Sequence, residues 1–134
     1  MTVASPAYLE RLGVPAALAD LARHQAVHYV STATGRPYPL EFMTDTGLKL
    51  ATPPGVVSVT GTEAYTAAAL AGLGLVQVPR YRIAEQLANG QLVEVLADAP
   101  PPTIPVSVLY PQARQLSARV RVFADWLVQR FRTA

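Results

Sequence analysis

The sequence of 134 residues predicts an α/β fold, on three observations. Short runs of β-branched and aromatic residues, such as "AVHYV" at 26–30 and "GVVSVT" at 55–60, are typical of buried strands. Other segments repeat apolar residues every three or four positions, as helices do. Strand and helix patterns alternate along the chain, which is the order expected of an α/β protein.

The first part of the chain predicts two short helices between two strands. A strand at "TVAS" leads to Ser5 and Pro6, which are favoured at the N-cap and the first position of a helix, and Gly13 ends that helix. A second helix is predicted over "VPAALADLARH" at 14–24, before the strand at 26–30. After a loop rich in Ser, Thr, Gly and Pro, three strands are predicted at "LEFMT", "LKLAT" and "GVVSVT".

The segment "TGTE", residues 60–63, predicts the start of the most regular helix. Thr60 at the N-cap and Glu63 three positions later match the pattern of a capping box. Small side chains predict the face that lies close against a sheet: Ala64, Ala67, Ala68 and Ala71. A strand at 75–78 follows this helix.

The last part of the chain continues the alternation. It predicts a helix at 81–90 that ends in "NG", a strand at 91–96, a proline-rich connector and a strand at 106–111. Ser117 then caps a long helix whose apolar stripe is formed by Val120, Phe123, Leu127 and Phe131.

The segment "AALAGLGLVQVP" holds two glycines, Gly72 and Gly74, that could belong to a nucleotide-binding loop. Such a loop needs the order strand, glycines, helix, so that the glycines lie at a helix N-terminus where phosphate is attracted. Here a helix precedes the glycines and a strand follows them, and Gln77 stands where a third glycine is required. We therefore interpret the glycines as the left-handed end of a helix.

Composition excludes several other classes. The chain has no cysteine, which rules out disulfides and thiolate chemistry, and its N-terminus does not resemble a signal peptide. Its longest charge-free apolar stretch, 64–79, is shorter than a membrane helix requires. Five arginines and one aspartate follow Ala113, and we interpret this basic end as a solvated helix face. A cytoplasmic protein with no membrane contact is expected.

Neither a metal site nor a catalytic site is predicted. His24 and His28 are four residues apart, but they fall at the end of a helix and inside a strand, so their side chains need not converge. No nucleophile elbow and no phosphate loop with its lysine occurs. We expect no cofactor, no metal and no enzyme activity.

Hydroxyl-bearing residues follow two of the predicted strands. Ser31 and Thr32 come after "VHYV", and Thr60, Gly61 and Thr62 come after "VSV". The carboxyl ends of strands in an open α/β sheet are the usual ligand crevice. These residues therefore form one wall of a polar pocket, or they serve only to cap and turn the chain, and spacing alone leaves both open.

Three long stretches carry a resemblance to a known family. They begin at "VASPAYLERLG", "GVVSVTGTEAYTAAALAGLG" and "IPVSVLYPQARQLSARVRVFADWL". In order and spacing they resemble the effector-binding domain of LysR-type transcriptional regulators. That domain has the fold of type 2 periplasmic binding proteins, in which two α/β lobes joined by crossover strands close on a small effector.

The resemblance implies one lobe of this fold, a mixed sheet flanked by helices, with crossover strands and a C-terminal helix. It places the first crossover at 1–5, the second lobe at 6–103, and a return strand with a helix of the first lobe at 104–134. The DNA-binding winged helix-turn-helix and most of the first lobe have no counterpart here. Leu40 stands near a place where relatives often carry Trp.

The resemblance also implies a function. The chain would be the effector-sensing module of a regulator, and its pocket residues would be Ser31, Thr32, Thr60, Gly61 and Thr62. The effector would be a small anionic metabolite, this chain alone would not contact DNA, and it would self-associate through its final helix. The alternatives are a solute-binding protein of the same fold and a small α/β enzyme.

Overall fold

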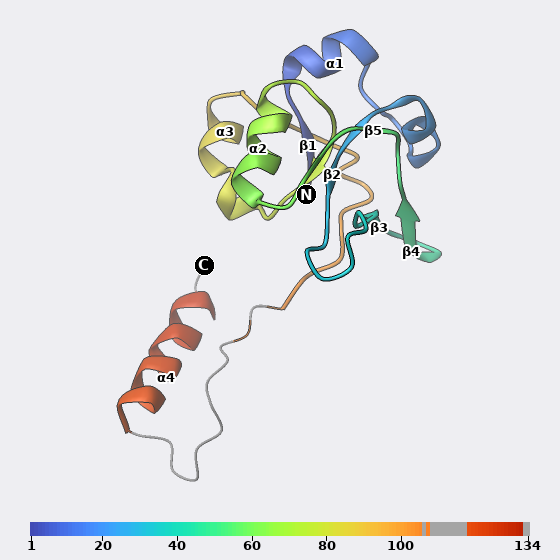
Figure 1. The fold of residues 1–134 in the computed structure, drawn as a ribbon. Helices are drawn as coiled ribbons and strands as arrows, with labels where there is room; N and C mark the ends of the chain where they lie inside the picture. Colours follow the sequence, from blue (N-terminus) through green and yellow to red (C-terminus); the bar gives the residue numbers. More distant parts are fainter. Residues whose placement is uncertain (106, 108–117, 133–134) are drawn as a thin grey trace. The chain divides into compact units, whose positions relative to one another are not determined.

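The computed structural model describes residues 1–105, 107 and 118–132. The chain divides into two compact units, Met1–Pro102 and Thr103–Ala134 (Figure 1). The strand predicted at 106–111 and the cap predicted at Ser117 lie outside the described residues.

The first unit is built on a mixed sheet, as predicted. Its strands are β1 (Thr2–Ala4), β2 (Ala26–Tyr29), β5 (Gly55–Val59), β6 (Val76–Gln77) and β7 (Val93–Val95). β1 pairs antiparallel with β6 on one side and with β7 on the other, while β2 and β5 are parallel. A parallel bridge between Ala26 and Leu75 joins the two groups, which gives the order β5-β2-β6-β1-β7.

Two short helical segments connect β1 to β2. In α1 (Pro6–Leu12) the hydroxyl of Ser5 accepts the N–H of Tyr8 at 3.4 Å, and Gly13 ends the helix with φ 83°, as predicted. The helix predicted at 14–24 is shorter and forms a 3₁₀ helix, η1 (Leu18–Arg23). The carboxylate of Asp20 takes up the backbone N–H groups of residues 16 and 17, so the chain turns there instead of extending the helix back to residue 14.

Helix α2 (Thr62–Leu70) starts one residue later than the capping box predicts. Its N-cap is Gly61, and no side chain caps it, so the prediction of Thr60 as N-cap is wrong. With this start Glu63 lies at the second helical position, out of register for a capping box. The buried face is also different from the predicted alanine face: it consists of Tyr65, Ala68 and Ala69. The large ring of Tyr65 enters the core, and this rotates Ala64, Ala67 and Ala71 towards solvent.

Glycine is required at the two positions after α2 for different structural reasons. Gly72 has φ 75°, its N–H donates to the carbonyl of Ala69, and the N–H of Leu73 donates to that of Ala68, which together form a Schellman motif. Gly74 lies against the backbone before β2, where an added Cβ would come within 2.9 Å of the Gln25 oxygen and of the Ala26 carbonyl carbon. The interpretation of this segment as a helix end, and not a phosphate loop, is confirmed.

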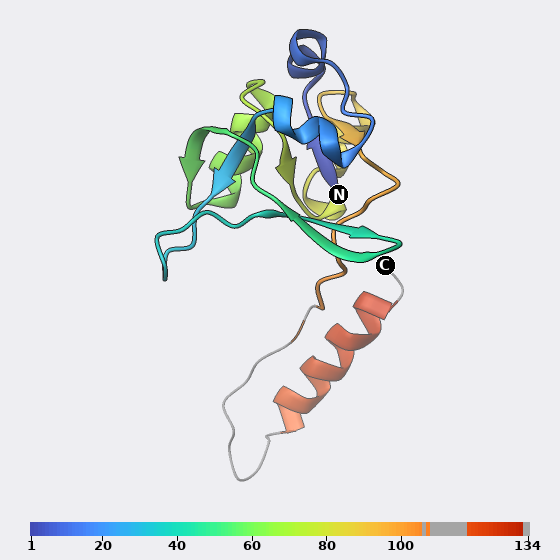
Figure 2. The same cartoon turned by 90° about the vertical axis from the view of Figure 1, so that its right-hand side faces the viewer.

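A hairpin and two short helical segments complete the first unit. The hairpin consists of β3 (Leu40–Thr44) and β4 (Gly47–Ala51), and it crosses below the sheet in the view of Figure 2. After β6 come the 3₁₀ helix η2 (Arg80–Arg82) and α3 (Ala84–Ala88), which ends at Asn89 with Gly90 at φ 74°.

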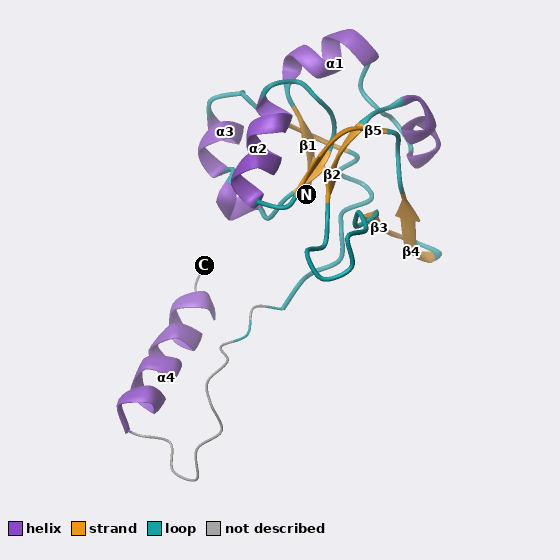
Figure 3. Cartoon of the chain, viewed as in Figure 1, coloured by secondary structure: helices purple, strands orange, loops and turns teal. Residues whose placement is uncertain are grey.

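The two faces of the sheet are covered by different elements. Successive side chains of a strand point to opposite faces, so neighbouring residues enter different cores. One core, covered by α2 and α3 (Figure 3), takes Val3 from β1 and Val27 from β2. The other core, covered by α1, η1 and the hairpin, takes Ala4 and Ala26 from the same strands. Both cores therefore depend on the register of the same short strands.

The second unit contains the long helix α4 (Ala118–Arg132), as the sequence predicts. Its side chains Val122, Phe123 and Trp126 are each more than half exposed.

Alanine substitutions at the two glycines are expected to have unequal costs. Gly72→Ala introduces only left-handed strain, about 1 kcal/mol, because its Cβ meets nothing closer than the Ser5 hydroxyl at 3.5 Å. Gly74→Ala forces a methyl group onto backbone atoms and is expected to cost about 3 kcal/mol. Urea unfolding of the two variants measures the difference, and equal midpoints would contradict the assignment of Gly74 to a close approach.

Candidate functional site

The structure brings the two predicted strand ends together. Tyr29 at the end of β2 pairs with Val59 at the end of β5, and the N–H of Val30 donates to the Val59 carbonyl at 2.7 Å. Because the two strands are parallel, their carboxyl ends lie at the same edge of the sheet. Residues 31–32 and 60–62 therefore follow neighbouring strands at this edge.

Ser31 is committed to the loop that follows β2. Ser31 is 8% exposed, and its hydroxyl accepts the N–H of Thr34 at 3.3 Å. Its backbone N–H donates to the carbonyl of Arg36, and its carbonyl accepts the N–H of Gly35. Thr32 is exposed. Ser31 thus shapes the loop, and Thr32 lies at its surface.

The turn from β5 into α2 presents backbone N–H groups at the same edge. The carbonyl of Gly61 accepts the N–H of Tyr65, which closes the first helical turn, and the N-cap Gly61 has no side chain to cap the helix. A Cβ built on Gly61 would meet nothing within 4 Å. Thr60 is exposed and Thr62 is half-buried, so this helix end faces open space.

An ion pair lies beside the helix end. The carboxylate of Glu63 accepts a hydrogen bond from the Arg82 guanidinium at 3.0 Å, and the Thr62 hydroxyl donates to the other carboxylate oxygen at 3.5 Å. The pKa of Glu63 is lowered, first by a hydrogen bond from its own backbone N–H and next by Arg82. Glu63 therefore stays charged and uses one of the N–H groups at the helix end.

Three tyrosines that sequence reasoning missed pack together next to this edge. The ring of Tyr65 contacts the ring of Tyr29 edge-on, with centroids 5.4 Å apart. The ring of Tyr38 also packs against Tyr29, with centroids 6.2 Å apart. Burial raises the pKa of Tyr65, whose hydroxyl accepts the N–H of Gln77 at 3.1 Å. These contacts fix the first turn of α2 against the end of β2. The signal in the sequence is the spacing of Tyr65, Ala68 and Ala69.

The two histidines are held by different partners. Nδ1 of His24 lies 3.0 Å from the Tyr8 hydroxyl, whereas Nε2 of His28 lies 3.0 Å from the carbonyl of Pro53. Within the described part of the chain, no three His, Asp or Glu side chains are grouped as metal ligands would be.

The fold and this edge define a class of protein: an α/β lobe whose adjacent strand ends form a polar surface. The family model described as the LysR substrate-binding domain matches residues 1–132. The chain belongs to this family of transcriptional-regulator domains, which confirms the resemblance seen in the sequence.

Curated relatives agree with this assignment. The chain is 39% identical over 124 residues to the uncharacterized HTH-type transcriptional regulator YhjC of Escherichia coli K12, an alignment that covers 92% of this chain and 42% of the relative. It is 28% identical to the HTH-type transcriptional regulator CrgA of Neisseria meningitidis serogroup B, with 95% and 42% covered. The chain thus spans about two fifths of the length of these relatives.

Solved structures agree on the fold. The regulatory domain of AphB from Vibrio vulnificus matches with a TM-score of 0.69 at 23% identity, covering 96% of this chain and 63% of that one. The CrgA regulatory domain from Neisseria meningitidis matches with a TM-score of 0.67 at 21% identity, covering 96% and 62%. Of the helices in the described ranges, none has the length and apolar character to cross a membrane.

The ion pair beside the helix end can be tested by removing its cation. In Arg82→Gln the carboxylate loses its charged partner, so the pKa of Glu63 is expected to rise towards its usual range while the backbone hydrogen bond keeps part of the depression. Carboxyl ¹³C NMR across an acid titration measures the change. Arg80→Gln is the matched control, because Arg80 lies 3.9 Å from Glu94 instead. A shift of equal size in both variants would contradict the pairing.

Proposed function

We propose that this chain is the effector-sensing part of a LysR-type transcriptional regulator and that it binds a small anion at the edge formed by Ser31, Thr32, Thr60, Gly61 and Thr62. The observation that carries the proposal is the uncapped N-terminus of α2 beside the end of β2. The family's transcriptional regulators favour this function over the alternatives of an exported solute-binding protein and a small enzyme.

The physical basis is the helix end itself. The first N–H groups of a helix lack partners within it, and the helix dipole places a partial positive charge there, so this end attracts anions. Gly61 leaves the approach open, and Thr60 and Thr62 offer hydroxyl groups on either side. Ser31 acts indirectly in this proposal, because its hydrogen bonds hold the loop that carries Thr32.

A single lobe supplies one wall of a binding cleft. We assign residues 1–5 to a crossover, 6–103 to the second lobe, and 104–134 to a return segment with a helix of the first lobe. A ligand on one wall keeps much of its water, so the affinity of this chain is expected to be weak. In the proposed role the chain is a cytoplasmic, non-catalytic sensor, and DNA is contacted by another part of the regulator.

Substitution at Gly61 tests the anion site. In Gly61→Asp a carboxylate enters the open space at the helix end and should weaken binding of succinate or benzoate by about fivefold. Gly61→Asn is the matched control, since it has the same shape and no charge. The measurement is the change in amide NMR shifts of residues 31–32 and 60–62 during titration of the 134-residue chain.

Two results would contradict this proposal. The first is the absence of shifts at these amides for any small carboxylate. The second is micromolar binding by the chain, because one wall is expected to give a dissociation constant of about a millimolar.

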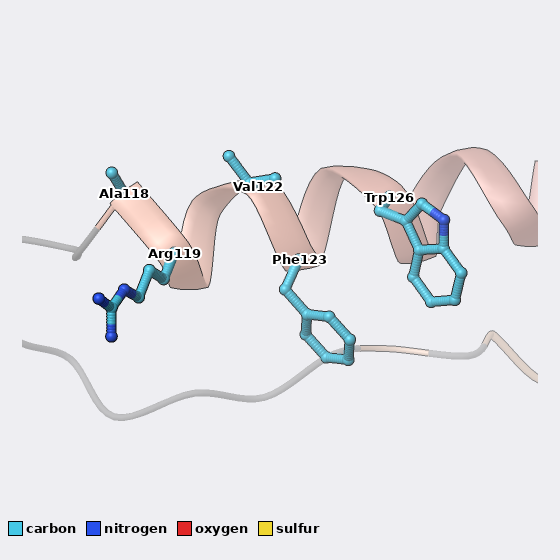
Figure 4. A pocket seen from close by; sticks show the side chains of 5 residues that line it. All are labelled: Ala118, Arg119, Val122, Phe123 and Trp126. Carbon is cyan, nitrogen blue, oxygen red and sulfur yellow. The ribbon is translucent and has the colours of Figure 1, made fainter.

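We also propose that the chain self-associates through α4. Phe123 and Trp126 stack with centroids 5.9 Å apart, and both rings project from the same side of the helix (Figure 4), where they form an exposed apolar surface. Large exposed apolar patches mark surfaces that associate. A second copy of the chain offers the same patch, and two such helices can cover each other.

Trp126→Lys is expected to weaken this association by about tenfold, because it removes an aromatic anchor and adds a charge. Asp125→Asn changes net charge by the same amount and leaves Phe123 and Trp126 in place, so it serves as the control. Light scattering over a concentration series measures both variants. A monomeric unsubstituted chain at about 0.1 mM would contradict the proposal.

A further inference from the structure

A polar cavity lies between the end of α1 and the 3₁₀ helix η1, at the amino end of β2. It measures about 400 Å³, within the range of roughly 300–1,000 Å³ typical of ligand pockets. Its polar lining consists of two arginines, a histidine and one carboxylate: Arg11, Arg23, His24 and Asp20. Residues 12–14 complete the wall. The effector edge proposed above follows the carboxyl end of β2, so the two places are distinct.

Both oxygens of the carboxylate in this cavity accept hydrogen bonds from the protein. One oxygen of Asp20 accepts the backbone N–H groups of Ala16 and Ala17 at 3.0 and 2.9 Å. The other oxygen accepts the guanidinium of Arg23 at 2.9 Å. With both Asp20 oxygens paired in this way, the other polar side chains of the cavity are two arginines and a histidine, and the lining carries a net positive charge.

Arg11 is held in place by two contacts. It donates one hydrogen bond to the carbonyl of Gly72 at 2.8 Å, and its guanidinium lies 5.6 Å from the centre of the Tyr8 ring. A guanidinium carries five N–H donors in a rigid fork. Arg11 is therefore pre-oriented, and its remaining donors are unassigned.

His24 supplies a second fixed group. Its side chain is 5% exposed, and Nδ1 is fixed by the Tyr8 hydroxyl at 3.0 Å. No hydrogen bond joins Nε2 to any described residue, yet the described part of the chain holds no fully buried side-chain nitrogen without a partner. His24 lines the cavity, and Nε2 is the ring nitrogen that is left to meet a ligand.

We propose that this cavity binds a small dianionic oxyanion, free or as the phosphate group of a small molecule, through Arg11, Arg23 and Nε2 of His24. Guanidinium groups are the preferred partners of tetrahedral oxyanions because their paired N–H groups match the oxygen spacing. The site is independent of the effector edge and does not need the function proposed for it.

The histidine makes binding depend on pH. Burial lowers the pKa of His24, Asp20 raises it, and Arg23 lowers it further, while the facing Tyr8 stays neutral because burial raises its pKa. A bound dianion favours the imidazolium form. Binding should therefore tighten as the pH falls, and the ligand should raise the pKa of His24.

Sulfate is the probe, because it stays a dianion across the range in which histidine titrates. The ¹⁵N-labelled chain is titrated with sodium sulfate at constant ionic strength, at about pH 6 and about pH 8. The expected result is a saturable shift of the His24 ring signals and of the amides of Gly13 and Val14, with tighter binding at the lower pH. A second titration with glycerol phosphate distinguishes a free oxyanion from the phosphate group of a small molecule. Tighter binding than sulfate indicates that the rest of the cavity holds an organic group. Equal binding indicates that the ligand is a free ion.

Arg23→Gln is expected to weaken sulfate binding by about tenfold, and its exposed side chain makes it the variant least disruptive to the fold. Arg80→Gln, with a similarly exposed arginine outside the cavity, should leave binding unchanged. Urea unfolding checks that both variants fold. Linear, non-saturating shifts, an equal effect of the two variants, or a pKa of His24 that sulfate leaves unchanged would each overturn the proposal.

Discussion

The fold depends on the placement of β1, a strand of three residues that lies between β6 and β7. Thr2, Val3 and Ala4 are at most 2% exposed, and they pair with β6 on one side and with β7 on the other. Val3 enters one core and Ala4 the other, so a slip of one residue would exchange both. The partner strands lie more than 70 residues further along the chain, so these pairings are long-range contacts. The crossover assigned to these residues by family resemblance is thus also the strand on which both cores are built.

A single side chain extends this sheet to the hairpin. The amide of Gln77 accepts the N–H of Glu41 and donates to the carbonyl of the same residue, both at 2.8 Å, so it pairs with β3 much as another strand would. The same amide nitrogen also donates to the Thr2 hydroxyl in β1, and the backbone N–H of Gln77 donates to Tyr65 in α2. A half-buried glutamine therefore hydrogen-bonds to the hairpin, to β1 and to the helix of the proposed effector edge. Unpaired backbone groups along β3 would otherwise be costly next to the buried Phe42.

Sequence reasoning succeeded where a local pattern alone determines the structure. Ser5, Pro6 and Gly13 delimit α1 as predicted, and Gly72 ends α2, because caps and left-handed turns depend on a few adjacent residues. It failed where tertiary packing selects among local options. Thr60 and Gly61 are both acceptable N-caps, and burial of the Tyr65 ring fixes the helix start and its buried face. The α/β pattern was enough to suggest that the two strand ends lie next to each other. The pairing of Glu63 with Arg82 joins residues 19 apart, and no short motif encodes it. The role of the five predicted site residues in effector binding remains a prediction.

The two anion sites proposed at the ends of β2 differ in the groups that would recognise an anion, and this difference separates them physically. At the carboxyl end the donors are backbone N–H groups of α2, which do not titrate near neutral pH, and the nearby carboxylate of Glu63 stays charged because its pKa is lowered. An anion there must compete with Glu63 for the helix end, so its affinity is governed by shape and charge and changes little with pH between the pKa values of carboxylates and tyrosine. At the amino end the buried imidazole of His24 lies beside two arginines, and protonation couples directly to an incoming anion. A change in affinity across the histidine range therefore identifies the cavity, and a pH-independent affinity identifies the effector edge, even when the same ion is used for both.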